Sequence, residues 1–74
     1  MNLEEKIFYN IASAKKLNWE PYWFGGATGD YCKAIDEDFI DTVIDWQKEH
    51  GLEGDGLVGP GTFRRIWTER ESTI

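Results

Sequence analysis

Apolar residues recur at spacings of three and four along the first part of the chain, which is the period of one face of an α-helix. Asn2 is a good N-cap, and Glu5 three residues later completes a capping box. Tyr9 and Lys16 lie with Glu5 on the opposite face. We therefore predict a helix over 2–17 and place its apolar stripe in the core. The stripe consists of Leu3, Ile7, Ile11, Ala14 and Leu17.

A second helical pattern follows Asp36, whose side chain can cap a helix and is followed by acidic residues that favour the positive end of a helix dipole. We predict a helix over 37–50. Its apolar arc consists of Phe39, Ile40, Val43, Ile44 and Trp46, bordered by Gln47 and His50. We expect Gln47 to hydrogen-bond a turn rather than take part in chemistry. Four carboxylates spaced four residues apart form the opposite arc, the acidic ridge, namely Glu37, Asp41, Asp45 and Glu49.

The residues after this helix predict a glycine-rich turn that leads into a third helix. Gly51 suits the left-handed conformation that closes a helix, and Leu52 can fold back over the last turn. Gly56 and Gly59 flank two apolar residues, and we expect both glycines to be required for the shape of the backbone. Pro60 suits the first position of a helix. We therefore predict a helix over 60–70, with Phe63, Ile66 and Trp67 as its apolar stripe.

Between the first two predicted helices the periodicity is lost, and the chain becomes rich in aromatic residues and glycine. One interpretation is that Trp19, Trp23 and Phe24 fill an otherwise thin core. The other is that some of Trp19, Tyr22, Trp23 and Tyr31 form a surface platform. Flat aromatic faces suit sugar rings, and amphipathic Tyr and Trp side chains suit a protein partner equally well.

These elements predict one small all-α domain that spans residues 1–74 and contains three helices joined by glycine-rich loops. A single core must hold so short a chain together, and its large aromatic side chains must contribute much of the buried area. The residues expected in this core are Leu3, Ile7, Ile11, Ala14, Phe39, Val43, Trp46, Leu52, Leu57, Val58, Phe63, Ile66 and Trp67.

The composition excludes several classes of function. The net charge is −6 and the pI is about 4.6, which argues against nucleic acid and anionic membranes as partners. The chain has one Cys and one His, too few for a zinc site of Cys and His ligands, so we expect neither a metal nor another cofactor. Paired carboxylates on a solvated helix face are not the environmentally distinct acids of a glycosidase. We therefore expect no catalytic residues and no enzyme.

The stretch around the third helix resembles the peptidoglycan-binding domain family. The matching residues are Trp46-Gln47, His50-Gly51-Leu52, Asp55-Gly56-Leu57-Val58-Gly59-Pro60-Gly61-Thr62 and Phe63. The match begins at Val43 and covers roughly the C-terminal third of the chain, and the resemblance implies a small three-helix fold of that family. The first half departs from the family pattern at 35–39, where the family has Phe-Gly-x-x-Thr. The aromatic segment and the resemblance together indicate five candidate ligand-binding residues, namely Trp19, Tyr22, Trp23, Tyr31 and Asp55.

Two functions from different classes follow. The resemblance implies a non-catalytic cell-wall module that binds peptidoglycan and targets a lytic enzyme or a particle to the bacterial wall. With no signal peptide at the start of the sequence, we expect cytoplasmic synthesis with a virion or cell-wall destination, as for a phage-encoded protein. The alternative is an acidic protein-interaction module, either a virion component or an inhibitor of a basic host protein, that binds through the acidic ridge. In both cases we expect a monomer when the chain is isolated.

Overall fold

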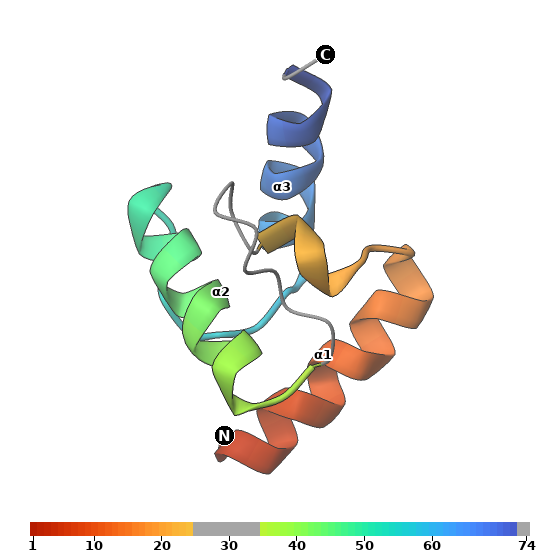
Figure 1. Cartoon of the computed structure of the whole chain (residues 1–74), viewed down its shortest axis with the longest axis vertical. Helices are drawn as coiled ribbons and strands as arrows, with labels where there is room; N and C mark the ends of the chain where they lie inside the picture. Colours follow the sequence, from red (N-terminus) through yellow and green to blue (C-terminus); the bar gives the residue numbers. More distant parts are fainter. Residues whose placement is uncertain (25–34, 73–74) are drawn as a thin grey trace.

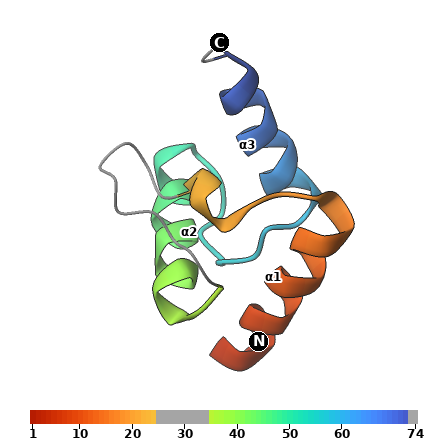
Figure 2. The ribbon, with the colours of Figure 1, turned by 45° about the vertical axis from the view of Figure 1, so that its right-hand side comes forward.

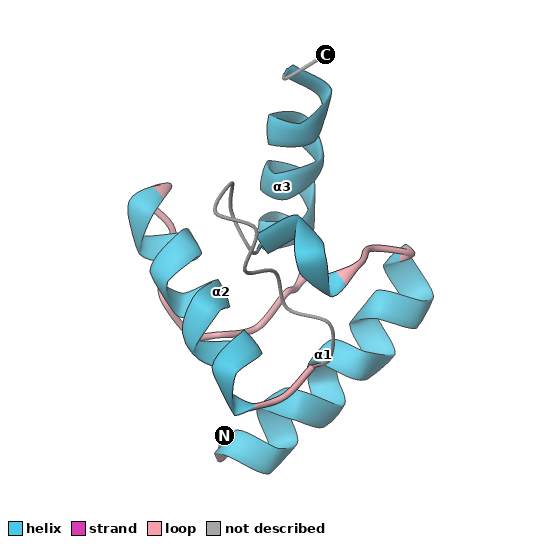
Figure 3. Ribbon diagram, viewed as in Figure 1, coloured by secondary structure: helices cyan, strands magenta, loops and turns pink. Residues whose placement is uncertain are grey.

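The computed structural model describes residues 1–24 and 35–72 of the 74-residue chain. In this part the chain forms three α-helices and one short 3₁₀ helix, with no strand (Figure 3). The elements are α1 (Leu3–Leu17), η1 (Pro21–Phe24), α2 (Glu37–Glu49) and α3 (Pro60–Ser72). The predicted all-α fold of three helices is therefore confirmed, and the predicted boundaries lie close to those observed.

The helices are splayed rather than parallel. In Figure 1, α1 and α2 diverge, and α3 projects beyond them with its C-terminal end farthest from the N-terminus of the chain. The segment that joins α2 to α3 crosses the space between α1 and α2, as the turned view in Figure 2 also shows. This connecting segment therefore lies at the centre of the molecule, where both helices can contact it.

The ends of the helices are fixed by local hydrogen bonds that the sequence predicts. Glu5 N–H donates to the Asn2 side chain at 2.9 Å, and Asn2 N–H donates to the Glu5 carboxylate at 3.3 Å, which completes the capping box. Asp36 accepts a backbone N–H from the first turn of α2 at 3.0 Å. Gly51 has a φ of 72°, and Leu52 N–H donates back to the last turn of α2 at 2.8 Å. These two residues form the predicted left-handed helix end.

Aromatic rings from the segment after α1 fill the centre of the core. The Trp19 ring is only 2% exposed, and it stacks on Phe39 with the ring centroids 5.6 Å apart. Phe24 meets Trp19, Phe39 and Trp46 edge-on. The interpretation in which these aromatics fill the core is confirmed for Trp19 and Phe24. Among the residues that the structure describes, the buried apolar ones are Trp19, Phe24, Phe39, Ile40, Val43, Val58 and Ile66.

The expected core face of α1 was wrong in part. Leu3 is 41% exposed and Ile11 is 36% exposed, whereas the most buried residues of the helix are Asn10 and Ser13. Ile7, Ala14 and Leu17 pack at the edge of the core. The helix is therefore rotated relative to its apolar stripe, because Asn10 and Ser13 hydrogen-bond the backbone of the connecting segment.

Trp67 is a second correction, because it was expected in the core and is 47% exposed. Its ring lies beside Trp23 of η1 and Phe63 of α3, with centroids 6.0 Å from each. Ile66, the neighbouring residue, was also expected in the core and is buried there. Trp46 is half-buried and packs against the core. Leu52 and Leu57 are also only half-buried.

Candidate functional site

The centre of the connecting segment is a turn formed by residues 55–58, which we call the central turn. The Gln47 side chain fixes it from α2 and is almost fully buried. Its Oε1 accepts the Gly56 N–H at 2.9 Å. Its Nε2 lies 3.0 Å from the Asp55 carboxylate, 3.1 Å from the Leu57 carbonyl and 3.1 Å from the Thr62 hydroxyl. The expectation that Gln47 serves a turn is therefore confirmed.

The opposite side of the central turn is held by α1. The Asn10 amide is fully buried, donates to the Gly56 carbonyl at 2.9 Å and accepts the Val58 N–H at 2.8 Å. The Ser13 hydroxyl donates to the Val58 carbonyl and accepts the Trp19 indole N–H at 3.0 Å. The turn is thus clamped between two helices by side chains that pair with its backbone groups, which would otherwise be buried without partners.

Only one of the two glycines expected to shape this turn has a left-handed backbone. Gly56 has a φ of 77°, and a Cβ added there would lie 2.9 Å from a methyl group of Ile40. Gly59 has no positive φ, so the expectation that its backbone conformation requires glycine was wrong. A Cβ at Gly59 would instead lie 3.1 Å from the Tyr9 hydroxyl. Gly59 therefore permits a close approach to α1.

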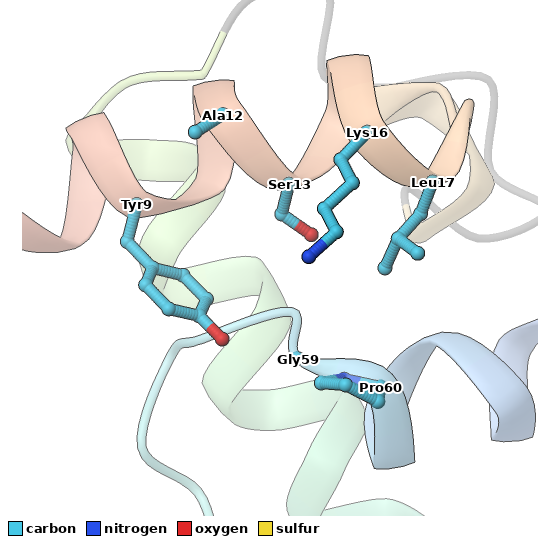
Figure 4. A pocket seen from close by; sticks show the side chains of 7 residues that line it. All are labelled: Tyr9, Ala12, Ser13, Lys16, Leu17, Gly59 and Pro60. Carbon is cyan, nitrogen blue, oxygen red and sulfur yellow. The ribbon is translucent and has the colours of Figure 1, made fainter.

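A pocket opens at this point between α1 and the start of α3 (Figure 4). Its volume is about 240 Å³. On α1 the large side chains of Tyr9 and Lys16 flank the small residues Ala12 and Ser13, and the opposite wall is Gly59, which has no side chain, with Pro60. The lining residues are Tyr9, Ala12, Ser13, Lys16, Leu17, Gly59 and Pro60. The pocket therefore exists because small residues face each other between two large ones.

The Ser13 hydroxyl in the pocket wall is already hydrogen-bonded to Val58 and Trp19, and the other polar side chains of the lining are the Lys16 ammonium and the Tyr9 phenol. Figure 4 shows the Lys16 amine and the Tyr9 hydroxyl reaching from α1 toward the segment at Gly59 and Pro60. Within residues 1–24 and 35–72, no carboxylate lies within ion-pairing distance of Lys16. The pocket also borders the N-terminus of α3, where the first backbone N–H groups have no intrahelical acceptor. The pocket thus favours a ligand that carries a negative charge beside an apolar surface.

The candidate residues drawn from the sequence do not come together in one site. Trp19, a candidate ligand-binding residue, is buried between other rings, so the alternative that placed it in a surface platform is wrong for this residue. The Asp55 carboxylate is occupied within the central turn, where it accepts from the Gln47 amide and from Leu57 N–H at 2.9 Å. Tyr31 lies outside the described residues.

Tyr22 and Trp23 lie on η1, beside the C-terminal part of α3. Tyr22 is about half exposed and Trp23 is half-buried. The Arg70 guanidinium lies 4.3 Å from the Trp23 ring centroid and 5.7 Å from that of Tyr22, within the range of cation–π attraction. With Trp67, these residues form an aromatic surface that is separate from the pocket lining.

The acidic ridge is a solvated surface of α2. Glu37, Asp41, Asp45 and Glu49 are all exposed. Across the described part of the chain, none of these four carboxylates forms an ion pair with a lysine, arginine or histidine. The ridge is therefore available as a negatively charged surface, as the sequence indicates.

Residues 1–24 and 35–72 hold no cluster of three or more His, Cys, Asp or Glu side chains arranged to bind a metal ion. Among the helices of this part, none has both the length and the apolar character needed to cross a bilayer. Comparison of the chain with models of protein families, with curated proteins and with solved structures finds no match. The case for a function therefore depends on the resemblance in the motif and on the geometry of the site.

Sequence reasoning missed the pocket, although its elements can be seen in retrospect. Tyr9 and Lys16 are two helical turns apart and enclose Ala12 and Ser13 on the same face of α1. This pattern of large and small residues marks a depression on a helix. It becomes a pocket only because Gly59 is brought opposite to it, and that contact joins residues far apart in the sequence.

Proposed function

We propose that this chain is a non-catalytic module that binds peptidoglycan, and that the pocket beside Tyr9 and Lys16 is its ligand site. One observation carries the proposal: Gly59-Pro60, which belongs to the motif resembling the peptidoglycan-binding family, forms one wall of the pocket. The resemblance of the motif supports the ligand class, and the place of Gly59 and Pro60 in the pocket wall supports this pocket as the site.

The chemistry of the pocket agrees with this ligand. Peptidoglycan consists of sugar rings with apolar faces and of short peptides that carry carboxylates. The Tyr9 ring offers an aromatic face and a hydroxyl, and the Lys16 ammonium can pair with a carboxylate. The pocket is smaller than the roughly 300–1,000 Å³ of sites for drug-sized ligands. It would therefore hold a single sugar ring or one or two peptide residues, and the remainder of the polymer would lie along the surface.

The test is co-sedimentation of the purified protein with insoluble peptidoglycan. We expect the wild-type chain to sediment with the polymer and the Lys16→Ala and Tyr9→Ala variants to remain in the supernatant. Lys48→Ala removes the same charge from an exposed position on α2 and serves as the matched control. Circular dichroism must show that each variant is folded. Wild-type protein that stays in the supernatant, or Lys16→Ala that binds as well as Lys48→Ala, would refute the assignment.

The aromatic surface provides a comparison within the same assay. Tyr22→Ala and Trp23→Ala alter exposed and half-buried rings outside the pocket. If the pocket is the site, both variants retain binding as long as they are folded. If they lose binding while Tyr9→Ala retains it, the ligand lies on the aromatic surface instead.

A second function, an acidic protein-interaction module, is favoured by the carboxylates of the ridge, which form no ion pair within the described residues. Binding of a basic protein through the ridge would weaken steeply with added salt, because the Debye length falls to about 8 Å at 0.15 M. Binding of glycan and peptide through short-range contacts in the pocket would change less. Asp41→Asn together with Asp45→Asn would weaken the first mode and leave the second unchanged.

A further inference from the structure

The surface of α1 that faces away from the rest of the molecule is apolar in its middle. Phe8 is 62% exposed and Ile11 is 36% exposed, and neither belongs to the core or to the residues that pack against it. In Figures 1 and 2, α1 lies at the edge of the molecule. Two large apolar side chains on one exposed helix face are more than the isolated apolar residues common on protein surfaces.

Charged residues of opposite sign flank these two side chains. Glu4 precedes Phe8 by four residues, and Lys15 follows Ile11 by four. With about 100° per residue, all four lie within roughly 60° of one another around the helix, at the spacing of four, three and four that is typical of a coiled-coil seam. We call Glu4, Phe8, Ile11 and Lys15 the outer face of α1. Over the described ranges, neither Glu4 nor Lys15 forms an ion pair.

This order of residues is complementary to itself when the helix is reversed. If a second α1 lies antiparallel on the first, Phe8 of one copy meets Ile11 of the other, and Glu4 of one copy lies opposite Lys15 of the other. A two-fold axis generates each contact twice. Within one copy Glu4 and Lys15 are about 16 Å apart along the helix, too far to pair with each other. Only a second copy brings them together.

We propose that two copies of this chain associate through the outer face of α1 in an antiparallel arrangement. From the sequence we expect a monomer, whereas this proposal predicts that the isolated chain forms dimers at high concentration. One pair of short helices buries less area than the roughly 1,200–2,000 Å² of stable interfaces, so the dimer is weak, with a dissociation constant between about 10 μM and 1 mM.

The association also bears on ligand binding, and this consequence rests on the proposed function. Tyr9 and Lys16 lie on a different side of α1 from the outer face, so pairing leaves both pockets open. A dimer would present two pockets to a polymer with repeating units, and linked sites bind such a polymer more tightly than one site does.

The experiment is a charge-exchange test by analytical ultracentrifugation without ligand. The protein concentrations span the expected dissociation constants, about 10 μM to 1 mM. Glu4→Lys alone and Lys15→Glu alone each replace two attractions by two repulsions. We expect each to raise the dissociation constant roughly ten- to thirty-fold. An equimolar mixture of the two variants should associate as well as the wild type, because positions 4 and 15 then carry opposite charges at both contacts between the two variants. Glu53→Lys makes the same charge change as Glu4→Lys outside the face and is the control.

Several results would overturn the proposal. If the wild-type chain is monomeric up to about 1 mM, its dissociation constant is higher than this face predicts. A mixture that associates no better than its components would rule out the antiparallel register. Phe8→Ser with undiminished association would place the contact elsewhere. Because the measurement uses no peptidoglycan, its outcome is independent of whether the pocket binds that polymer.

Discussion

Replacing Asn10 by alanine should be among the most destabilising single changes in this chain. The residue lies in the middle of α1 and is fully buried, and its amide pairs with the Gly56 carbonyl and the Val58 N–H at 2.9 and 2.8 Å. Alanine would leave both backbone groups buried without a partner. Its neighbour Ile11 is apolar but 36% exposed, so Ile11→Ala should change the stability far less.

The magnitude follows from the two lost hydrogen bonds. A buried group left without its partner costs about 1–3 kcal/mol, so two such groups cost about 2–6 kcal/mol. A chain of this length is stable by roughly 4–11 kcal/mol in total. With about 4–8 °C of melting temperature per kcal/mol, Asn10→Ala should lower the melting temperature by at least about 8 °C or leave the chain unfolded.

The measurement is thermal and urea unfolding of both variants, followed by far-UV circular dichroism and tryptophan fluorescence at low protein concentration. Asn10→Asp is the closest control in shape, because it keeps an acceptor for Val58 N–H but, as a carboxylate, cannot donate to the Gly56 carbonyl. It should also be destabilised. If Ile11→Ala proved more destabilising than Asn10→Ala, the orientation of α1 described here would be wrong.

Four further substitutions test other parts of the structure. Gly56→Ala should destabilise the fold by about 1–3 kcal/mol in urea unfolding, because the φ of 77° is unfavourable for alanine and the added Cβ meets Ile40; an unchanged midpoint would contradict this. Trp19→Ala should cost about 3–5 kcal/mol and Trp67→Ala clearly less, so equal melting temperatures would count against the burial described here. Gly59→Ala should retain the melting temperature but weaken co-sedimentation with peptidoglycan, because its methyl group enters the pocket beside the Tyr9 hydroxyl.

Helix boundaries were predictable because they depend on local chemistry. Each helix end depends on bonds within a few residues, so both partners lie in the same short stretch of sequence. This holds for the Asn2 cap, the Asp36 cap and the left-handed Gly51. Gln47 was also assigned correctly to a turn, because its amide lies beside an apolar arc and shortly before a glycine-rich segment. Such signals need no knowledge of how the helices meet.

The orientation of α1 was not predictable from its pattern. Leu3 and Ile11 continue an apolar stripe, yet the helix turns Asn10 and Ser13 inward. Hydropathy treats a buried amide as unfavourable, but here it satisfies backbone groups of a turn more than forty residues later in the chain. The same long-range contact explains why the pocket was missed, since its two walls come from the same two segments.

The clamp on the central turn and the pocket are parts of one arrangement. Asn10 and Ser13 hold Gly56 and Val58 against α1, and Gly59 follows directly, so its distance from Tyr9 is set by these buried hydrogen bonds. These hydrogen bonds oppose a separation of the pocket walls. A site held in this way loses little conformational freedom when a ligand enters, which favours affinity in a small pocket. The motif that resembles the peptidoglycan-binding family would then act mainly by placing a rigid wall opposite α1, while Tyr9 and Lys16 supply the contacts.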